Sequence, residues 1–244
     1  MICDRLLGFT VAFAWGTMAW AAEPSPLPPV ITEPACCAGS SRSAAISLDL
    51  LADETAWKLG DPTAWQWDSS AREWNLKRQS SYQPPYRSPA NLAWFEPREW
   101  CSFSLTMECQ LTSWNEGNND LCIAFGGSGA DRFYYAHLGE KTDEPHHQIH
   151  IVNRADRRAI TTYRTPGTPW KKDVWHRVKV VRNAETGDIA VWFDENPQPI
   201  LTARDRSLTW GKIGIGSFDD TGRFRHIRIR GQSRAVSSAP TNGQ

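Results

Sequence analysis

The chain has 244 residues, with 27 Lys and Arg against 27 Asp and Glu, so its formal net charge at pH 7 is zero. This balance gives no overall field to attract nucleic acid or an anionic membrane, and it argues against both classes of partner. The six cysteines show neither a Cys-x-x-Cys pair nor a Cys/His spacing typical of zinc sites.

The first 22 residues have the pattern of a secretory signal peptide. An apolar run at residues 6–20 follows a single arginine, and residues 19–21 read Ala-Trp-Ala, a small-residue pattern typical of a cleavage site. The run is shorter than the ~20 apolar residues of a membrane span, and no later segment is apolar enough to cross a bilayer. We therefore expect a secreted, periplasmic or envelope-associated chain with no membrane span after cleavage. An uncleaved N-terminal anchor is the alternative.

Two further segments lack the composition of a folded core. Residues 23–43 contain five prolines together with Ala and Ser, which predicts a semi-extended linker. Residues 232–244 contain Ser, Pro, Asn and Gly and almost no large apolar residue, which predicts a disordered tail. The remaining residues 44–231 are enough for one β-sandwich domain with a substantial core.

Five cysteines remain after residue 22, so at least one thiol lies outside any intramolecular disulfide. Cys101 and Cys109 share one predicted strand, where eight residues span ~26 Å, and they therefore cannot pair with each other. We interpret both as core residues. A bridge between Cys109 and Cys122 is disfavoured because their side chains fall on different strand faces. The pair at residues 36–37 has no interpretation.

From residue 46 onward, apolar side chains recur with a period of two, which is typical of strands with one buried face. A Trp-rich opening predicts a hairpin, and a Pro-rich loop leads to a short strand at residues 92–95. The clearest strand is residues 101–111, where apolar and polar side chains alternate without a break. Further strands are expected at residues 121–125, two within 131–153, 159–163, 175–182, 189–193, 213–215 and 227–229.

No stretch carries a capped apolar pattern of period 3.6, so the pattern predicts an all-β chain. About a dozen short strands, separated by turn residues every ~8 to 12 positions, favour a sandwich or barrel. Closing two antiparallel sheets over one core is how such strands bury their apolar faces. We predict a two-sheet antiparallel jelly-roll β-sandwich.

The stretch at residues 131–153 leaves an unusual set of side chains on its outer face. Tyr134, Ala136 and Leu138 alternate toward the core. Their neighbours point the other way, namely Tyr135, His137, Gln148 and His150. Aromatic and imidazole groups are seldom left in water without a ligand, so we expect a binding surface here.

Three segments resemble the strands of concanavalin A-like lectin/glucanase jelly rolls, including laminin-G-like and 3-keto-disaccharide hydrolase domains. They are WHRVKVVR at residues 175–182, TGDIAVWFD at 186–194 and GKIGIG at 211–216. The resemblance covers residues 94–231. It implies a concanavalin A-like sandwich that recognises a glycan on a concave sheet, where some members of the superfamily also cleave it.

The sequence departs from the glucanases at the catalytic motif. Family-16 glucanases carry Glu-x-Asp-x-x-Glu on one strand, whereas this chain contains no Glu-x-Asp, and residues 101–111 offer Glu108 alone. A two-carboxyl mechanism needs groups ~5 Å apart for retention or ~6.5 to 9.5 Å apart for inversion. If residues 101–153 form a meander, Glu108 and Asp120 are the candidate catalytic pair on the surface that carries Tyr135.

Binding without cleavage is the preferred interpretation of that surface. A glycoside hydrolase in the same groove, a cell-surface protein interaction module, and ordinary outer residues are the alternatives. Trp192 shares a strand face with Ala190 and Asp194, and we expect it to be exposed and available to a ligand. No cofactor is implied, except that Asp219 and Asp220 could supply oxygen ligands to a structural calcium; the same residues are also typical of a tight turn.

Overall fold

The structure is a computed structural model that describes residues 45–236. The predicted signal peptide at residues 1–22 and the linker at 23–43, with its cysteine pair, lie outside the described residues. Residues 237–244 of the predicted tail lie outside them as well. In the part of the chain that the structure describes, no helix is long and apolar enough to cross a membrane.

Residues 45–236 fold into strands and a single 3-10 turn, Glu54–Ala56. The strands are β1 (Ile46–Asp49), β2 (Trp57–Leu59), β3 (Trp65–Asp68), β4 (Glu73–Leu76), β5 (Asn91–Leu111), β6 (Cys122–Gly129), β7 (Arg132–His137), β8 (Gln148–Asn153), β9 (Arg158–Ala159), β10 (Thr161–Arg164), β11 (His176–Arg182), β12 (Asp188–Phe193), β13 (Leu201–Arg204), β14 (Gly211–Ser217) and β15 (Gly222–Ala235).

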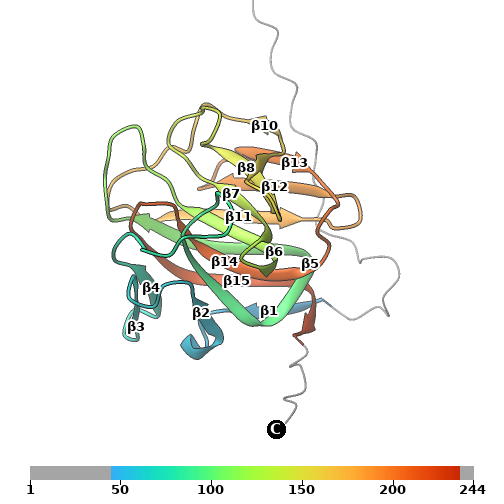
Figure 1. The fold of residues 1–244 in the computed structure, drawn as a ribbon, viewed down its shortest axis with the longest axis horizontal. Coiled ribbons are helices and arrows are strands. Elements are labelled where there is room, and N and C mark those ends of the chain that lie inside the picture. Colours follow the sequence, from blue (N-terminus) through green and yellow to red (C-terminus); the bar gives the residue numbers. More distant parts are fainter. Residues whose placement is uncertain (1–44, 237–244) are drawn as a thin grey trace, which may run out of the picture.

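The strands form two antiparallel sheets that share β5 (Figure 1). The first sheet contains β2, the start of β5, β14, β6, β7, β8 and β9. The second contains β10, β13, β12, β11, the end of β5 and β15, with β1, β4 and β3 beyond β15. The predicted antiparallel jelly-roll sandwich is confirmed.

Strand β5 is one continuous strand of 21 residues, not the two strands expected from the sequence. Its first residues, from Asn91 to Phe95, pair with β14, whereas Phe103 to Cys109 pair with β11. One strand can therefore belong to both sheets. The break expected between the strands at residues 92–95 and 101–111 is wrong. Pro97 has no partner residue in β14, and a proline at such a position does not end a strand.

The core lies between the two sheets and follows the predicted alternation. Phe103, Leu105 and Met107 of β5 are buried in it, and so are Phe125 and Tyr134 from the facing sheet. The ring centroids of Phe103 and Phe125 lie 6.0 Å apart in an edge-to-face arrangement. Each such side chain contributes roughly 1.5–3 kcal/mol by leaving water, which makes this core the main source of stability.

The outer face of the first sheet carries a second, smaller hydrophobic cluster. Leu92, Cys122, Phe133 and Tyr135 are buried there, among others. This face is therefore covered by other segments of the chain instead of facing open water. The three described cysteines, Cys101, Cys109 and Cys122, are all buried, which confirms the core interpretation of the first two.

The C-terminal boundary predicted at Gly231 is wrong. Strand β15 continues to Ala235 and pairs with the middle of β5, with Ser233 opposite Trp100 and Arg234 opposite Glu99. Sequence composition missed this segment because its side chains are small or charged. The pairing depends on backbone hydrogen bonds to β5, which any non-proline residue can make.

Candidate functional site

Four of the predicted ligand-binding residues lie together on the outer face of the first sheet. In the register of β7 and β8, Tyr135 is opposite His150 and His137 is opposite Gln148. Tyr135 and His150 stack with centroids 4.9 Å apart and an interplanar angle of 15°. Asp120, at the entrance of β6, joins them through a 3.2 Å contact between its Oδ2 and His137 Nε2. These five residues are called the His137 cluster below.

The His137 cluster is buried, so the expectation that it faces water is wrong. Tyr135 is 0% exposed, His137 1% and His150 2%. Burial lowers the pKa of His150 and raises that of Tyr135, so both side chains are neutral at pH 7. A ligand could reach this cluster only after the covering segments moved.

Segments distant in sequence cover the cluster. The Phe218 ring, from the loop after β14, lies with its centroid 5.0 Å from that of His137. The Arg157 guanidinium sits 4.5 Å above the Phe218 ring and donates through Nη1 to Tyr135 Oη at 3.2 Å. The strand alternation assigned Tyr135 and His137 to the correct face, but it carried no information on these loops.

The loop before β8 closes the remaining side. Its Pro145 carbonyl accepts a hydrogen bond from His137 Nδ1 at 2.9 Å. The loop is fixed by His147, which is fully buried with its two ring nitrogens 3.0 Å from the hydroxyls of Thr168 and Thr165. The backbone of His147 is left-handed, with φ of 49°. The buried His147 ring therefore anchors this loop to the segment at residues 165–168.

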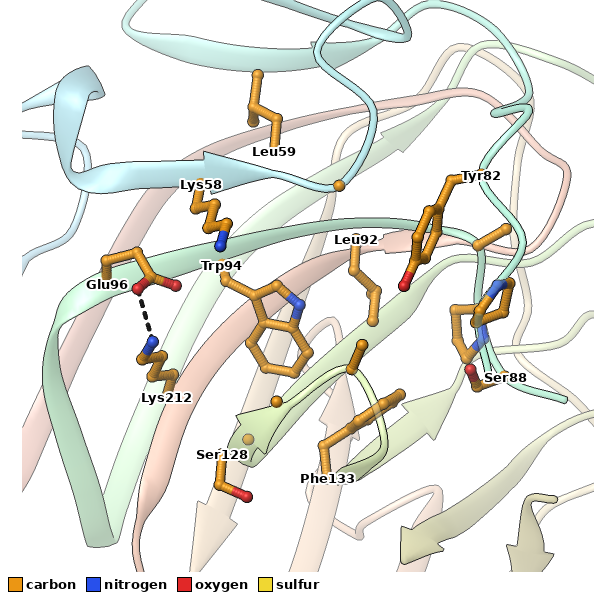
Figure 2. A pocket seen from close by; sticks show the side chains of 17 residues that line it. Lys58, Leu59, Tyr82, Ser88, Leu92, Trp94, Glu96, Ser128, Phe133 and Lys212 are labelled. Carbon is orange, nitrogen blue, oxygen red and sulfur yellow. Dashed lines mark hydrogen bonds and ion pairs between the residues drawn. The ribbon is translucent and has the colours of Figure 1, made fainter. Parts of the chain in front are cut away.

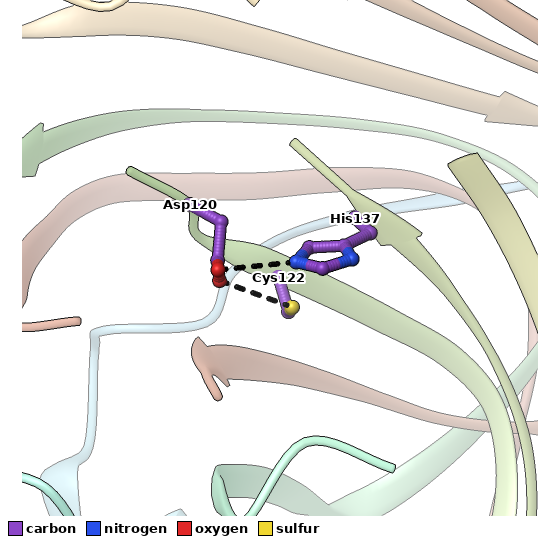
Figure 3. Close-up of side chains that lie close together, drawn as sticks. All are labelled: Asp120, Cys122 and His137. Atoms are coloured by element: carbon purple, nitrogen blue, oxygen red, sulfur yellow. Dashed lines mark hydrogen bonds and ion pairs between the residues drawn. The ribbon is translucent and has the colours of Figure 1, made fainter. Parts of the chain in front are cut away.

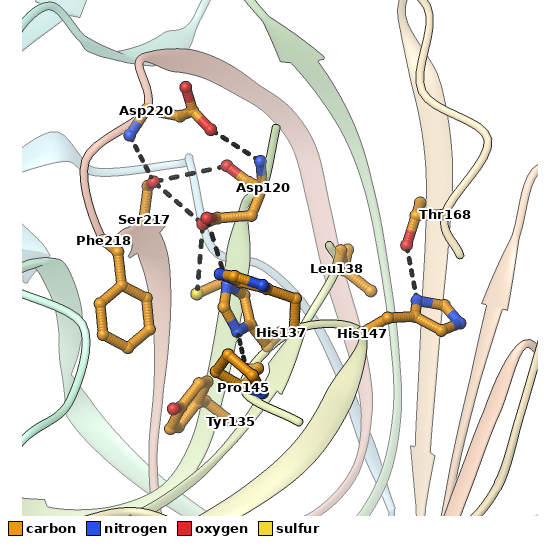
Figure 4. A network of polar contacts seen from close by, with 12 residues as sticks. Asp120, Tyr135, His137, Leu138, Pro145, His147, Thr168, Ser217, Phe218 and Asp220 are labelled. Atoms are coloured by element: carbon orange, nitrogen blue, oxygen red, sulfur yellow. Dashed lines mark hydrogen bonds and ion pairs between the residues drawn. The ribbon is translucent and has the colours of Figure 1, made fainter. Parts of the chain in front are cut away.

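A polar network continues from Asp120 toward the turn after β14 (Figure 4). Asp220 is buried and accepts hydrogen bonds from the Asp120 N–H and from Ser113 Oγ, both at 2.7 Å. Burial raises the pKa of Asp220 to about 6. Asp219 is exposed, and oxygen atoms of Asp120, Asp219 and Asp220 lie within 4.8 Å of one another. The calcium predicted at Asp219 and Asp220 stays a prediction.

Glu108 does not lie near Asp120, so the predicted catalytic pair is not brought together. Glu108 is on the outer face of the second sheet, between Arg177 of β11 and Arg225 of β15, and its Oε2 accepts from Arg225 Nε at 2.7 Å. The expected meander fails because β14 lies between β5 and β6. Trp192 is on that second sheet as well, half-buried beneath Lys179 Nζ at 5.3 Å from its ring.

A groove that no sequence pattern indicates lies at the other end of the first sheet's outer face. It encloses about 430 Å³ and is lined by the start of β5, the β6–β7 hairpin and the Pro-rich loop before β5 (Figure 2). The Trp94 indole lies at its base, edge-to-face with Phe133 at 5.4 Å, and Tyr82 stands on the opposite wall. We call it the Trp94 groove.

Two glycines shape the base of the groove. A Cβ on Gly127 would overlap the Trp94 ring, and one on Gly214 would come within 2.9 Å of it. The indole can therefore lie against the backbone of the sheet, because neighbouring strands present no side chain there. The alternation of Leu92, Trp94 and Glu96 was a signal for a shared face, but nothing in the sequence indicated that these glycines would surround the ring.

Charged groups line one side of the groove. Lys212 Nζ and Glu96 Oε2 form an ion pair at 2.6 Å, and Lys58 is the cross-strand neighbour of Trp94. Among the described residues that line the groove, Glu96 is the only carboxylate. The Trp94 groove thus combines an aromatic base with a few hydrogen-bonding groups, a composition typical of small-ligand sites.

Comparison with known proteins identifies the fold but no family. No protein-family model matches the sequence, and no curated protein matches it. Solved structures do match. A carbohydrate-binding module CBM66 from Bacillus subtilis shares 15% identity with a TM-score of 0.52, covering 71% of this chain and 94% of that one. The winged bean acidic lectin, solved with methyl-α-D-galactose, shares 12% identity with a TM-score of 0.51, covering 79% and 100%.

A third match is a putative glycosyl hydrolase from Parabacteroides distasonis, with 12% identity and a TM-score of 0.52, covering 77% of this chain and 100% of that one. The chain has the concanavalin A-like lectin/glucanase fold. Within this concanavalin A-like fold, the Trp94 groove and the His137 cluster lie on the outer face of the first sheet. Glu108 and Trp192 lie on the outer face of the second.

Proposed function

We propose that the chain is a carbohydrate-binding β-sandwich and that the glycan occupies the Trp94 groove. The observation that carries the proposal is the Trp94 indole at the base of an open groove of about 430 Å³. An aromatic face stacks on the C–H face of a pyranose ring, and flanking polar groups bond its hydroxyls. Lys58, Glu96 and Lys212 are placed to make those bonds.

The structural neighbours support this class of ligand. They include a carbohydrate-binding module and a lectin solved with a galactoside. The neutral charge balance of the chain gives no reason to prefer nucleic acid. Export of the chain, as a secreted, periplasmic or envelope-associated protein, is part of the proposal and rests on the signal pattern at residues 1–22.

We propose binding and not hydrolysis because the groove offers one carboxylate. The usual glycosidase mechanisms need two carboxyls flanking the scissile bond. Glu96 is the only carboxylate among the described lining residues, and it is already paired with Lys212. Glu108 cannot supply the second, because it lies on the other sheet.

The proposal is tested by a glycan array with the purified chain, followed by calorimetry on the best ligand. Trp94→Ala should weaken binding by about 2 kcal/mol, roughly thirtyfold, because it removes the stacking surface. Trp192→Ala is the matched control, since it removes a half-buried tryptophan from the opposite sheet. Its affinity should stay within twofold of the unmodified chain.

Three outcomes would contradict the proposal. Failure to bind any glycan of a broad panel would favour a protein interaction module. Loss of affinity in Trp192→Ala but not in Trp94→Ala would move the site to the second sheet. Release of new reducing ends from the bound glycan would favour the hydrolase alternative.

A further inference from the structure

At the His137 cluster, on the outer face of the first sheet, three side chains place an oxygen, a sulfur and a nitrogen close together (Figure 3). They are Asp120, which lies two residues before β6, Cys122, the first residue of β6, and His137, the last residue of β7. One ligand atom of each lies within 4.8 Å of the other two. The Asp120 Oδ2 to His137 Nε2 distance is 3.2 Å, and the Cys122 Sγ to Asp120 Oδ1 distance is 4.0 Å.

These distances are close to those of a metal site. Zinc bonds to oxygen and nitrogen measure about 2.0–2.2 Å and those to sulfur about 2.3 Å, so tetrahedral ligand atoms lie roughly 3.3–3.8 Å apart. The Asp120–His137 and Asp120–Cys122 distances differ from that range by a few tenths of an ångström, and Cys122 and His137 lie within 4.8 Å of each other. The three side chains are therefore close enough to converge on one ion.

The orientation of the His137 ring is an independent indication. Its Nδ1 faces the Pro145 carbonyl, which can only accept, so Nδ1 carries a proton. Its Nε2 is buried and directed at the Asp120 carboxylate, and it has no hydrogen-bond partner among the described residues, although the two atoms are within ion-pair distance.

A buried ring nitrogen that faces a carboxylate without a hydrogen bond is a position that a metal ion would satisfy. Here the side chains of His137 and Asp120 are 1% and 5% exposed. An imidazole that donates Nδ1–H to a backbone carbonyl and directs Nε2 inward has the usual arrangement of a metal-binding histidine.

We propose that Asp120, Cys122 and His137 bind a divalent transition-metal ion of the zinc class. A set of one nitrogen, one sulfur and one carboxylate oxygen suits zinc, whereas calcium and magnesium require oxygen ligands. Three protein ligands leave a fourth tetrahedral position, which a water molecule would fill. The site does not depend on glycan binding in the Trp94 groove.

No residue spacing in the sequence indicates this site. Cys122 and His137 are separated by the whole β6–β7 hairpin and become cross-strand partners only through the register of those strands. Burial raises the pKa of the Cys122 thiol well above its ordinary value, so the metal-free site holds a thiol and metal binding would expel a proton.

The test uses the full chain, treated with a chelator, dialysed and titrated with Co²⁺. We expect one Co²⁺ per chain with a thiolate-to-cobalt charge-transfer band, and displacement by Zn²⁺. Cys122→Ala should lose the band and bind at least tenfold more weakly, and His137→Gln should also bind at least tenfold more weakly. Cys109→Ala is the matched control, because Cys109 is an equally buried thiol in the core between the sheets.

Several results would overturn the proposal. They are the absence of stoichiometric Co²⁺ or Zn²⁺ binding, a charge-transfer band that survives in Cys122→Ala, and calcium binding without transition-metal binding. The last result would assign an oxygen-only site to Asp120, Asp219 and Asp220. If the Cys122 variant does not fold, alkylation of the unmodified chain, mapped by peptide mass spectrometry, decides the question. Zinc should slow alkylation of Cys122 but not of Cys109.

Discussion

His147 shows how a single buried side chain holds one wall of the His137 cluster. Its ring is fixed between Thr165 and Thr168, and its left-handed backbone turns the chain into β8. The loop therefore presents the Pro145 carbonyl to His137 at a fixed position. Burial, aided by the positive charge of Arg164, lowers the pKa of His147 from 6.5 to about 4.

This pKa predicts a pH dependence of stability. Between pH 6.5 and 4 the unfolded chain takes up a proton at residue 147 that the folded chain does not, so stability is present above pH 6.5 and is lost as the pH falls. The slope from this group is at most about 1.4 kcal/mol per pH unit. His147→Asn keeps a residue that tolerates positive φ and removes the titration.

Urea unfolding of the wild type and of His147→Asn, from pH 7.5 to 4.5, measures this contribution. As the pH falls, the free energy of unfolding of the wild type should decrease more than that of His147→Asn. His226→Asn controls for the backbone, because His226 also has a positive φ but is exposed. Parallel pH profiles for the wild type and His147→Asn would contradict the assignment.

At the scale of the elements, the close packing of β14 between β5 and β6 holds the strands of the first sheet, and so its outer face, in position. Gly216 of β14 lies opposite Leu92 of β5 on one side and Cys122 of β6 on the other. A Cβ at this position would overlap the Asn91 carbonyl oxygen. Glycine is needed here because backbone, and not a movable side chain, occupies the space.

Gly216→Ala should therefore destabilise the sheet. Overpacking against backbone typically costs 1–3 kcal/mol, and about 2 kcal/mol lowers the melting temperature of a domain of this size by roughly 4–8 °C. Gly129→Ala is the matched control in the β6–β7 hairpin, where the nearest atom is a side-chain oxygen of Asp131 at 3.2 Å. Differential scanning calorimetry compares the two, and equal melting temperatures would refute the argument.

At the scale of the whole molecule, β5 and β15 tie the two sheets together. The last residues of β15 pair with β5 at the point where β5 passes from one sheet to the other, next to the buried Trp100. Arg234 bonds Glu99 through Nε at 2.7 Å, and its guanidinium lies 4.8 Å from the ring of Trp210. These contacts cover the junction of the two sheets and stabilise it.

A chain shortened after Gly231 should consequently be less stable than one shortened after Val236. It loses the backbone hydrogen bonds of residues 232–235 and the Cys101 Sγ to Gln232 Oε1 contact at 3.2 Å. At about 1 kcal/mol for each hydrogen bond, we expect a loss of about 2–4 kcal/mol, or roughly 5–15 °C. Coincident thermal melts of the two shortened chains would show that the junction does not need β15.

The sequence by itself determined which side chains face the core. The alternation of Phe103, Leu105 and Met107, and that of Tyr134 with Tyr135, follows from the two-residue period of a strand, which any partner strand preserves. The antiparallel sandwich follows as well, because strands with one apolar face have few other ways to bury it. These properties are local, so they can be derived from neighbouring residues.

Only the tertiary structure decided what covers each face and which strands are neighbours. Glu108 and Asp120 are separated because β14, more than 100 positions further along the chain than Glu108, lies between their strands. His137 is buried because Phe218 and the loop at Pro145 cross it. Trp94 lies at the base of a groove because Gly127 and Gly214 leave room for its ring. Such contacts depend on strand order and loop paths, which local alternation does not encode.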